Sequence, residues 1–335
     1  MQPSNKYYLV IRRFINYFLG PLLFIWLSFS IYTQIKNQPN LELSWIKIKN
    51  SINSVAGWNL LIVGILMIVN WSLEALKWKL AVTKIQVVSF TKSLKAVLSG
   101  VSFSVSTPNR MGEYLGRVLY MEEGNRLRTI SITIVSSMSQ VIITLLMGGL
   151  GLVFLMKNLQ TSDITSSLWI RVILFGVTIV FLLLTLFYFR LAWVVKLFER
   201  IPGSGKYTYL VNAVEEFNAT LLLRLLSLSL LRFIVFGIQY YLLFSLFGVE
   251  VTWWQGFWSM SITFLVLAII PTIALVELGL RGEISLKILN LFSQNGLGIG
   301  LTTATIWLIN LVIPAVIGSL LILSIKIFKN KNERI

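Results

Sequence analysis

Six long apolar stretches constrain the fold of this 335-residue chain more than any other feature. Each is long enough for a membrane-spanning helix, which needs about 20 mostly apolar residues. Hydrophobic residues make up 56% of the chain and charged residues only 13%, whereas soluble domains carry roughly 25% charged residues. The sequence therefore predicts an all-α polytopic membrane protein. We expect its six full transmembrane helices to cover residues 14–35, 58–80, 129–157, 168–189, 221–247 and 298–327.

The basic residues predict the orientation of these helices. With the N-terminus in the cytoplasm, 20 of the 29 Lys and Arg residues lie in inside segments, five lie in outside loops, and four lie in or beside apolar segments. Loops rich in Lys and Arg stay on the cytoplasmic side, so we expect both termini and a linker over 190–220 to be cytoplasmic. Stretch 14–35 lacks a small-x-small cleavage site, and we expect it to be retained as an anchor. The net charge of +16 is then explained by orientation, and no nucleic-acid partner is expected.

The residue types that the chain lacks exclude much of enzyme chemistry. It has no His and no Cys, and Asp163 is its single Asp. Disulfides, thiolate nucleophiles, His-based triads and imidazole metal ligands are therefore excluded. The sequence has no glycine-rich nucleotide-binding loop either. We expect no catalytic residue set, no metal and no cofactor.

Two shorter apolar segments are interrupted by proline. Residues 96–107 run into Pro108, and residues 253–270 run into Pro271. Alternation of the six spans requires the first segment to return to the cytoplasmic side and the second to return to the outside. Both are predicted to be re-entrant hairpins, which a membrane tolerates where they are buried or line a cavity.

The order of spans and hairpins repeats along the chain. Each half contains two spans, a hairpin and a further span, and Pro108 in one half matches Pro271 in the other. We expect a single domain built from two inverted repeats, about 1–160 and 161–335. Repeats of this kind, interrupted at matching positions, mark the central site of many transporters. A coincidence of helix lengths in a generic bundle is the alternative.

The first interrupted segment leads into a charged helix. Thr107 is predicted to cap a helix that begins at Pro108, which places Arg110, Glu113 and Arg117 on one helical face. Two guanidinium groups beside a carboxylate, near a helix N-terminus, suit a phosphate-bearing headgroup. An Arg–Glu–Arg clasp that only fastens the hairpin is the alternative.

The second interrupted segment leads into two possible ion pairs. Glu277 and Arg281 are four residues apart, and so are Glu283 and Lys287. Such groups beside an apolar segment are costly unless they are paired or wet, so they either bind a headgroup or form a structural clasp. Arg232, eleven residues into stretch 221–247, needs a carboxylate or a lipid phosphate as its partner. The candidate substrate-binding residues are Arg110, Glu113, Arg117, Arg232, Glu277, Arg281 and Glu283.

Other residues are assigned structural roles. Glu74 and Lys77 are expected to form a local ion pair, because they are three residues apart near the inner end of a span. Small residues can let two helices approach closely. The residues expected to shape the two hairpins are Pro108, Gly112, Gly116, Pro271, Gly279 and Gly282.

The two motifs resemble those of a known family. Pro108-Asn109-Arg110-Met111-Gly112-Glu113 is similar to the Pro-Gly-Arg-x-Gly-Glu element of the lysylphosphatidylglycerol synthase transmembrane (flippase-like) family. Pro271 through Glu283 resembles the second element of that family, and Trp78-Lys79 resembles its aromatic-basic ending of the second span. The resemblance implies a bacterial or archaeal cytoplasmic membrane protein and a lipid-flipping role, best attested for aminoacylated phosphatidylglycerol. The sequence ends eight residues after Ile327, so we expect no soluble aminoacyltransferase domain.

The leading hypothesis is a lipid translocase that moves a phospholipid or glycolipid headgroup across the membrane. Its expected partner is an anionic or aminoacylated phospholipid, or a polyprenyl-linked glycan. One alternative is a membrane enzyme of lipid or polyprenyl-phosphate chemistry, which would have to use Glu113, Glu277 or Glu283 as its base. Another alternative is a membrane scaffold without transport activity.

Overall fold

The computed structural model describes residues 46, 50, 57–105, 107, 110–161, 166–191, 193, 217–270 and 274–323. Over these residues the chain forms helices joined by short turns and contains no strand. In chain order the helices are α4 (Gly57–Val82), α5 (Phe90–Ser104), α6 (Gly112–Val118), η3 (Glu123–Asn125), α7 (Arg126–Thr161), α8 (Ser167–Phe189), α11 (Ala219–Leu246), α12 (Trp253–Ile269), α13 (Ala274–Leu289), α14 (Gly296–Trp307), the π-helix η5 (Leu308–Val312) and α15 (Ile313–Ile322).

Five of the six predicted apolar stretches form helices that are long and apolar enough to cross a membrane. They are α4, α7 with η3, α8, α11, and the continuous run of α14, η5 and α15. The sixth stretch, 14–35, lies outside the described residues, as does most of the linker 190–220. The prediction of an all-α membrane protein is confirmed at this level.

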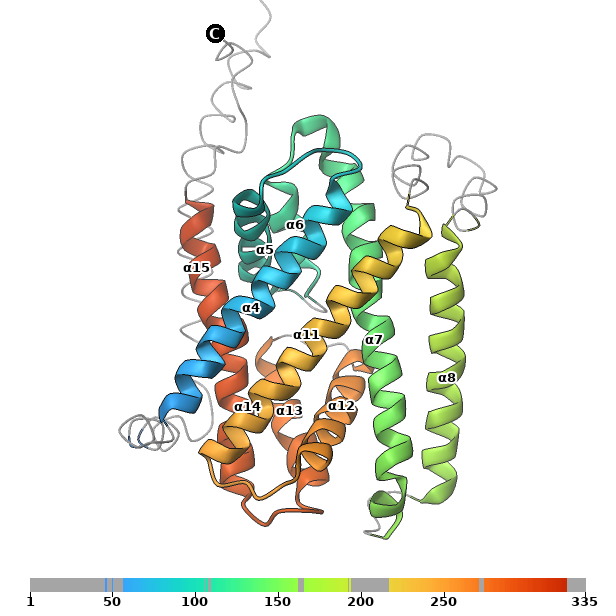
Figure 1. The fold of residues 1–335 in the computed structure, drawn as a ribbon, viewed down its shortest axis with the longest axis vertical. Helices are drawn as coiled ribbons and strands as arrows, with labels where there is room; N and C mark the ends of the chain where they lie inside the picture. Colours follow the sequence, from blue (N-terminus) through green and yellow to red (C-terminus); the bar gives the residue numbers. More distant parts are fainter. Residues whose placement is uncertain are drawn as a thin grey trace, which may run out of the picture.

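The long helices frame two short helical pairs. In Figure 1, α4 and α11 cross the molecule diagonally, α7 and α8 run beside them, and α14 with α15 lies on the opposite side. The pair α5–α6 occupies one end of the frame, and the pair α12–α13 occupies the other. The two pairs point toward each other along the long axis (Figure 1), and Arg110, just before α6, forms an ion pair with Glu277 on α13.

Glycine permits the close packing of α5 against α6. A Cβ atom on Gly116 would lie 2.4 Å from the Cα of Gly100, and one on Gly112 would lie 2.3 Å from the carbonyl oxygen of Phe103. Carbon atoms in contact lie about 3.5–4.0 Å apart, so neither position has room for a side chain. Small residues here bring the two backbones into contact, as the sequence suggested.

The start of α6 differs from the prediction. The helix begins at Gly112, not at Pro108, and Pro108 itself lies outside the described residues. Arg110 has a left-handed backbone with φ of 57°, and a right-handed helix cannot pass through such a residue. The N-cap of α6 is therefore Met111 and not Thr107, although the Thr107 hydroxyl oxygen accepts a hydrogen bond of 2.8 Å from the N–H of Gly112.

Over the described residues, the pair α12–α13 does not show the close glycine contact between its two helices that α5–α6 shows. Thr252 forms a capping box with Gln255 at the start of α12, and α12 packs against α7 where Gly148 and Gly151 leave space for its side chains. Pro271 lies outside the described residues. Gly279 has no described atom within 4 Å of its would-be Cβ position, so close packing on α13 does not depend on it. Gly282 has only the hydroxyl of Thr303 nearby, at 3.9 Å.

Candidate functional site

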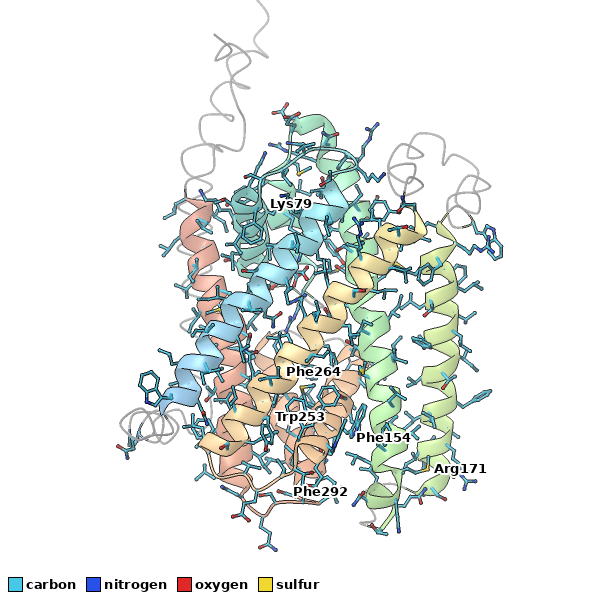
Figure 2. All side chains as sticks on the ribbon, viewed as in Figure 1. Lys79, Phe154, Arg171, Trp253, Phe264 and Phe292 are labelled. Carbon is cyan, nitrogen blue, oxygen red and sulfur yellow. The ribbon has the colours of Figure 1, made fainter. Side chains whose placement is uncertain are left out.

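A cavity of about 480 Å³ lies where the two helical pairs meet. Its walls come from both pairs and from α4, α7, α11 and the α14–η5 run, so that helices distant in the sequence contribute to one chamber. Phe264, one of its apolar lining residues, lies near the middle of the molecule in Figure 2. The lining residues are Trp71, Glu74, Lys77, Arg110, Glu113, Tyr114, Arg117, Ser137, Gln140, Val141, Thr144, Arg232, Phe236, Phe264, Leu267, Ala268, Ile270, Glu277, Arg281, Ile306, Trp307, Asn310 and Leu311.

Eight of these lining residues are charged, and they form a network of six ion pairs. Five are cations and three are carboxylates, which leaves the cavity lining with two positive charges in excess. Charges buried in a membrane protein are costly and mark ion or substrate paths. The cations are Lys77, Arg110, Arg117, Arg232 and Arg281, and the carboxylates are Glu74, Glu113 and Glu277.

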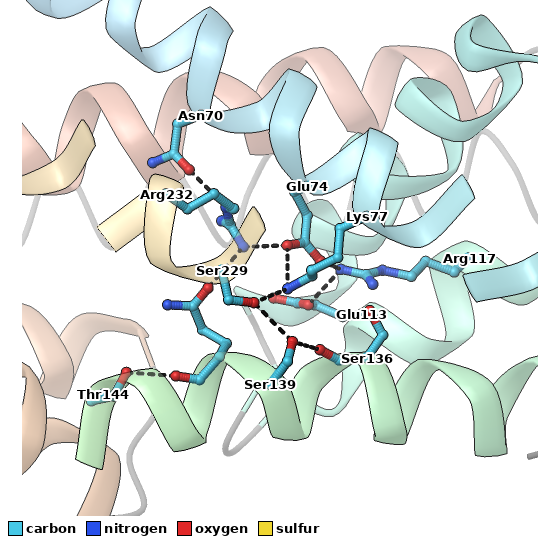
Figure 3. Close-up of polar contacts among 11 residues, drawn as sticks. Asn70, Glu74, Lys77, Glu113, Arg117, Ser136, Ser139, Thr144, Ser229 and Arg232 are labelled. Carbon is cyan, nitrogen blue, oxygen red and sulfur yellow. Dashed lines mark hydrogen bonds and ion pairs between the residues drawn. The ribbon is translucent and has the colours of Figure 1, made fainter. Parts of the chain in front are cut away.

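Glu74 on α4 is the centre of the larger part of this network (Figure 3). Its carboxylate contacts Lys77 Nζ at 2.8 Å and Arg117 Nη2 at 2.9 Å, and it also accepts a hydrogen bond from Arg232 Nη1. Arg117 makes a second ion pair of 2.9 Å with Glu113, one turn earlier on α6. Glu74 is 4% exposed, so three cations compensate a carboxylate that water scarcely reaches.

Arg232 joins α11 to α4 through further contacts. Its Nε donates a hydrogen bond of 2.7 Å to Asn70 Oδ1, and its guanidinium lies 5.6 Å from the ring centroid of Trp71, close enough for a cation–π interaction. A weaker hydrogen bond of 3.4 Å reaches Gln140 Oε1 on α7. The partner that the sequence required for Arg232 is therefore a helix carboxylate, Glu74, supported by two amides.

A second ion-pair group joins the two helical pairs. Arg110 Nη2 lies 2.9 Å and 3.2 Å from the two carboxylate oxygens of Glu277, and Arg281 Nη2 lies 2.5 Å from Glu277 Oε1. Arg281 is further fixed by a hydrogen bond of 3.1 Å to the Tyr240 hydroxyl and by its position over the Phe264 ring. Arg110 remains 44% exposed, whereas Arg281 is buried. Arg110 is thus the more accessible of the two guanidinium groups that bind Glu277.

A chain of hydroxyl groups extends from Lys77 into the helix interface. Lys77 Nζ donates to Ser229 Oγ at 3.4 Å, and Ser229 Oγ lies 2.8 Å from Ser139 Oγ (Figure 3). Ser139 in turn donates to the carbonyl of Ser136 at 2.6 Å. These bonds connect α4, α11 and α7 through serines that do not line the cavity, and they fix the position of the Lys77 side chain.

Six of the seven candidate substrate-binding residues line the cavity: Arg110, Glu113, Arg117, Arg232, Glu277 and Arg281. The structure does not place Glu283 with them. Its side chain is 63% exposed and forms an ion pair of 2.8 Å with Lys287, one turn further along α13. The spacing of these two residues predicted their pairing but could not tell which face of α13 is turned toward the cavity.

Glu74 and Lys77 are charged residues of the cavity lining that were not among the predicted binding residues. They form the expected local ion pair, but both also line the cavity, and Glu74 binds three cations. The signal was the presence of a carboxylate within an apolar span, a position where an ionisable residue marks a site by default. Because Glu74 lies three residues before Lys77, a local ion pair was enough to explain the charge in the sequence, and a role in a binding site was not predicted.

The arrangement is suited to binding an oxyanion. Guanidinium groups bind phosphate through paired N–H donors, and four of the five cations are arginines. Apolar and aromatic side chains from α11 and α12 form the adjoining wall. Among the described residues, no group of three or more His, Cys, Asp or Glu could hold a metal ion.

A family model described as "Lysylphosphatidylglycerol synthase TM region" matches residues 17–318 of the chain. This range includes both helical pairs and every residue that lines the cavity. A search of curated proteins found no match.

Proposed function

The chain belongs to the lysylphosphatidylglycerol synthase transmembrane family, and on this premise we propose that it is a lipid translocase. The family match and the apolar helices make it a multi-pass membrane protein with a lipid-related function. In the proposed mechanism, a phosphate-bearing headgroup crosses through the polar cavity while the acyl chains stay in the bilayer.

The observation that carries this proposal is the position of the cavity. Residues of α6, α12 and α13 line it, and these helices belong to two pairs that occupy opposite ends of the long axis (Figure 1). A headgroup that crosses a bilayer needs polar partners halfway, because an uncompensated charge there is costly. Five cations and three carboxylates provide such partners.

The proposed membrane arrangement follows from the same geometry. We take α5–α6 and α12–α13 to be re-entrant hairpins that belong to two inverted repeats and enter from opposite sides of the membrane. With the excess of Lys and Arg on the cytoplasmic side, α5–α6 enters from the cytoplasm, both termini are cytoplasmic, and the membrane is the cytoplasmic membrane of a bacterium or archaeon. The ion pair between Arg110 and Glu277 then joins the tips of the two hairpins.

The ion pair between the hairpins has a role in the proposed cycle. The Arg110 side chain is 44% exposed, more than any other cation in the ion pairs of the cavity. An entering phosphate can therefore reach it. When the phosphate replaces Glu277 as the partner of Arg110, the two hairpin tips are no longer joined. The headgroup can then continue toward the opposite side.

Reconstitution in liposomes tests the proposal. Vesicles that contain the purified protein are expected to move fluorescent phospholipids between leaflets faster than protein-free vesicles, as measured by dithionite quenching. The variant Arg110→Gly removes the guanidinium and is tolerated by the left-handed backbone at this position, and it should slow transport about tenfold or more, since charge-assisted hydrogen bonds are among the strongest.

The matched control is Arg171→Ala. Arg171 is exposed at one end of α8, far from Phe264 in Figure 2, and does not line the cavity, so this variant should transport lipid as fast as the unaltered protein. Transport no faster than in protein-free vesicles would contradict the translocase proposal. Mass spectrometry of the same lipids, if it showed a covalently altered product, would favour a membrane enzyme instead.

A further inference from the structure

Every carboxylate in the described cavity lining is already bound by cations. Glu74 has three such partners, Glu277 has two guanidinium groups, and Glu113 has Arg117. A positively charged ligand group entering the cavity would therefore have to displace a lysine or an arginine from its carboxylate. Separating a buried ion pair leaves an uncompensated charge, which is strongly unfavourable.

The sequence offers no additional carboxylate from the apolar spans. Stretch 14–35, which lies outside the described residues, contains no Asp and no Glu. The four other carboxylates among the described residues do not line the cavity. They are Glu122, Glu123, Glu250 and Glu283.

Hydrogen-bond donors, in contrast, are in excess around the cavity. The five cations of the lining outnumber its three carboxylates by two. Two of the buried arginines, Arg117 and Arg281, keep guanidinium nitrogens without an acceptor among the described residues: Nε and Nη1 of Arg117, and Nε of Arg281. Buried donors without an acceptor are rare and call for an explanation. Arg110, which is partly exposed, can bind a new oxyanion at the cavity surface.

From this balance of charges we infer that the transported headgroup has a net negative charge and carries no ammonium group. An anionic phospholipid such as phosphatidylglycerol fits, because its phosphate binds guanidinium groups and its glycerol hydroxyls need no carboxylate. The lysyl ester of the same lipid does not fit, because its ammonium groups find no unoccupied carboxylate among the described residues that line the cavity. This inference rests on the proposed role of the cavity as the headgroup path.

Transport of two lipids with opposite net charge tests the inference. Proteoliposomes are prepared with fluorescent phosphatidylglycerol or with fluorescent lysylphosphatidylglycerol in an otherwise identical phosphatidylcholine vesicle. The anionic lipid is expected to move at least about tenfold faster than the cationic one, because a unit charge is strongly discriminated in a site of low dielectric constant. Equal rates, or faster transport of the lysyl ester, would overturn the inference.

Two variants change the charge balance in opposite directions without a large change in volume. Glu113→Gln leaves three positive charges in excess and should increase the ratio of the two transport rates. Arg110→Gln leaves one and should decrease it. Arg171→Ala, away from the cavity, should leave the ratio unchanged, and a ratio that moved equally in all three variants would contradict an effect of cavity charge.

Binding of the same two lipids separates this inference from the translocase proposal. Native mass spectrometry of the purified protein in detergent should show phosphatidylglycerol retained over its lysyl ester, and less so in Arg110→Gln. If no lipid is transported but this binding preference is present, the translocase proposal fails and the charge selectivity of the cavity stands. If the lysyl ester binds as well as phosphatidylglycerol, the inference fails whatever the transport result.

Discussion

Glu74 is the residue on which the buried charge network depends. Its carboxylate compensates Lys77, Arg117 and Arg232, which come from three different elements, α4, α6 and α11. Cations of this kind repel one another when the central carboxylate is removed, and water scarcely reaches them because all three are 9% exposed or less. The identity of this one side chain therefore affects how three helices pack.

We predict that Glu74→Gln destabilises the protein while preserving the volume of the side chain. The free energy of unfolding should fall by about 3–5 kcal/mol, the usual effect of breaking a buried ion pair. Circular dichroism during denaturation by sodium dodecyl sulfate measures this change. Glu283→Gln serves as the control, because the ion pair between Glu283 and Lys287 is mostly exposed, and this variant should have no measurable effect on stability. Equal stability of the two variants would show that the network around Glu74 does not hold the helices together.

Much of the candidate site could be predicted from residue types, and the rest could not. A buried arginine in a membrane helix requires a partner, which identified Arg232, and paired charges after a broken apolar segment identified Arg117 and Glu277. The partners themselves were not predictable, because the contact between Arg232 and Glu74 spans 158 positions of the chain. The face of α13 on which Glu283 lies depends on how that helix packs, and its sequence spacing does not reveal it.

At the scale of elements, the packing of α5 against α6 fixes where the first cavity wall lies. Gly116 on α6 contacts Gly100 on α5 so closely that no side chain fits between them. Arg117, the next residue, is held at 1% exposure by this packing and aligned with Glu74. The geometry of the ion-pair network therefore follows from a contact between two glycines.

We predict that Gly116→Ala separates these helices and destabilises the protein. Its Cβ atom would lie 2.4 Å from the backbone of Gly100, and overpacking of this kind costs about 1–3 kcal/mol. Gly279→Ala is the matched control within a helix, because nothing described lies within 4 Å of that position. It should instead stabilise the protein by about 0.5–1 kcal/mol, the usual gain when alanine replaces glycine in a helix. The same denaturation experiment measures both, and a stable Gly116→Ala variant would contradict the close packing.

The long helices were predictable as elements because their apolar stretches exceed the length that a soluble helix needs. The irregular turns within these helices could not be predicted from the sequence. Residues 308–312 form a π-helix that ends two residues before Pro314, a residue that has no N–H to donate within the helix. A π-helical turn widens the backbone, and such turns often lie at functional sites. Here Asn310, within this turn, lines the cavity, a consequence that a hydropathy pattern cannot indicate.

At the scale of the whole molecule, the two helical pairs approach the cavity from opposite ends of the long axis. The ends of α5–α6 lie at one end of the long axis, and those of α12–α13 lie at the other (Figure 1). If both pairs are re-entrant, each begins and ends on the same side of the membrane, and the two sides differ. The span count and the sequence order of the two halves are compatible with this arrangement, and chemical labelling can decide it.

The absence of cysteine from the sequence makes that labelling direct, because each introduced thiol is unique. We predict that a membrane-impermeant maleimide labels single-cysteine variants at Glu250 and Asn290 in intact spheroplasts. It should label variants at Thr91 and Glu123 only after the membrane is permeabilised. All four positions are exposed: Thr91 is the second residue of α5, Glu123 follows α6, Glu250 precedes α12 and Asn290 follows α13. Labelling of Thr91 and Glu123 from opposite sides would mean that α5–α6 crosses the membrane, and labelling of all four positions from one side would mean that the two halves are not inverted.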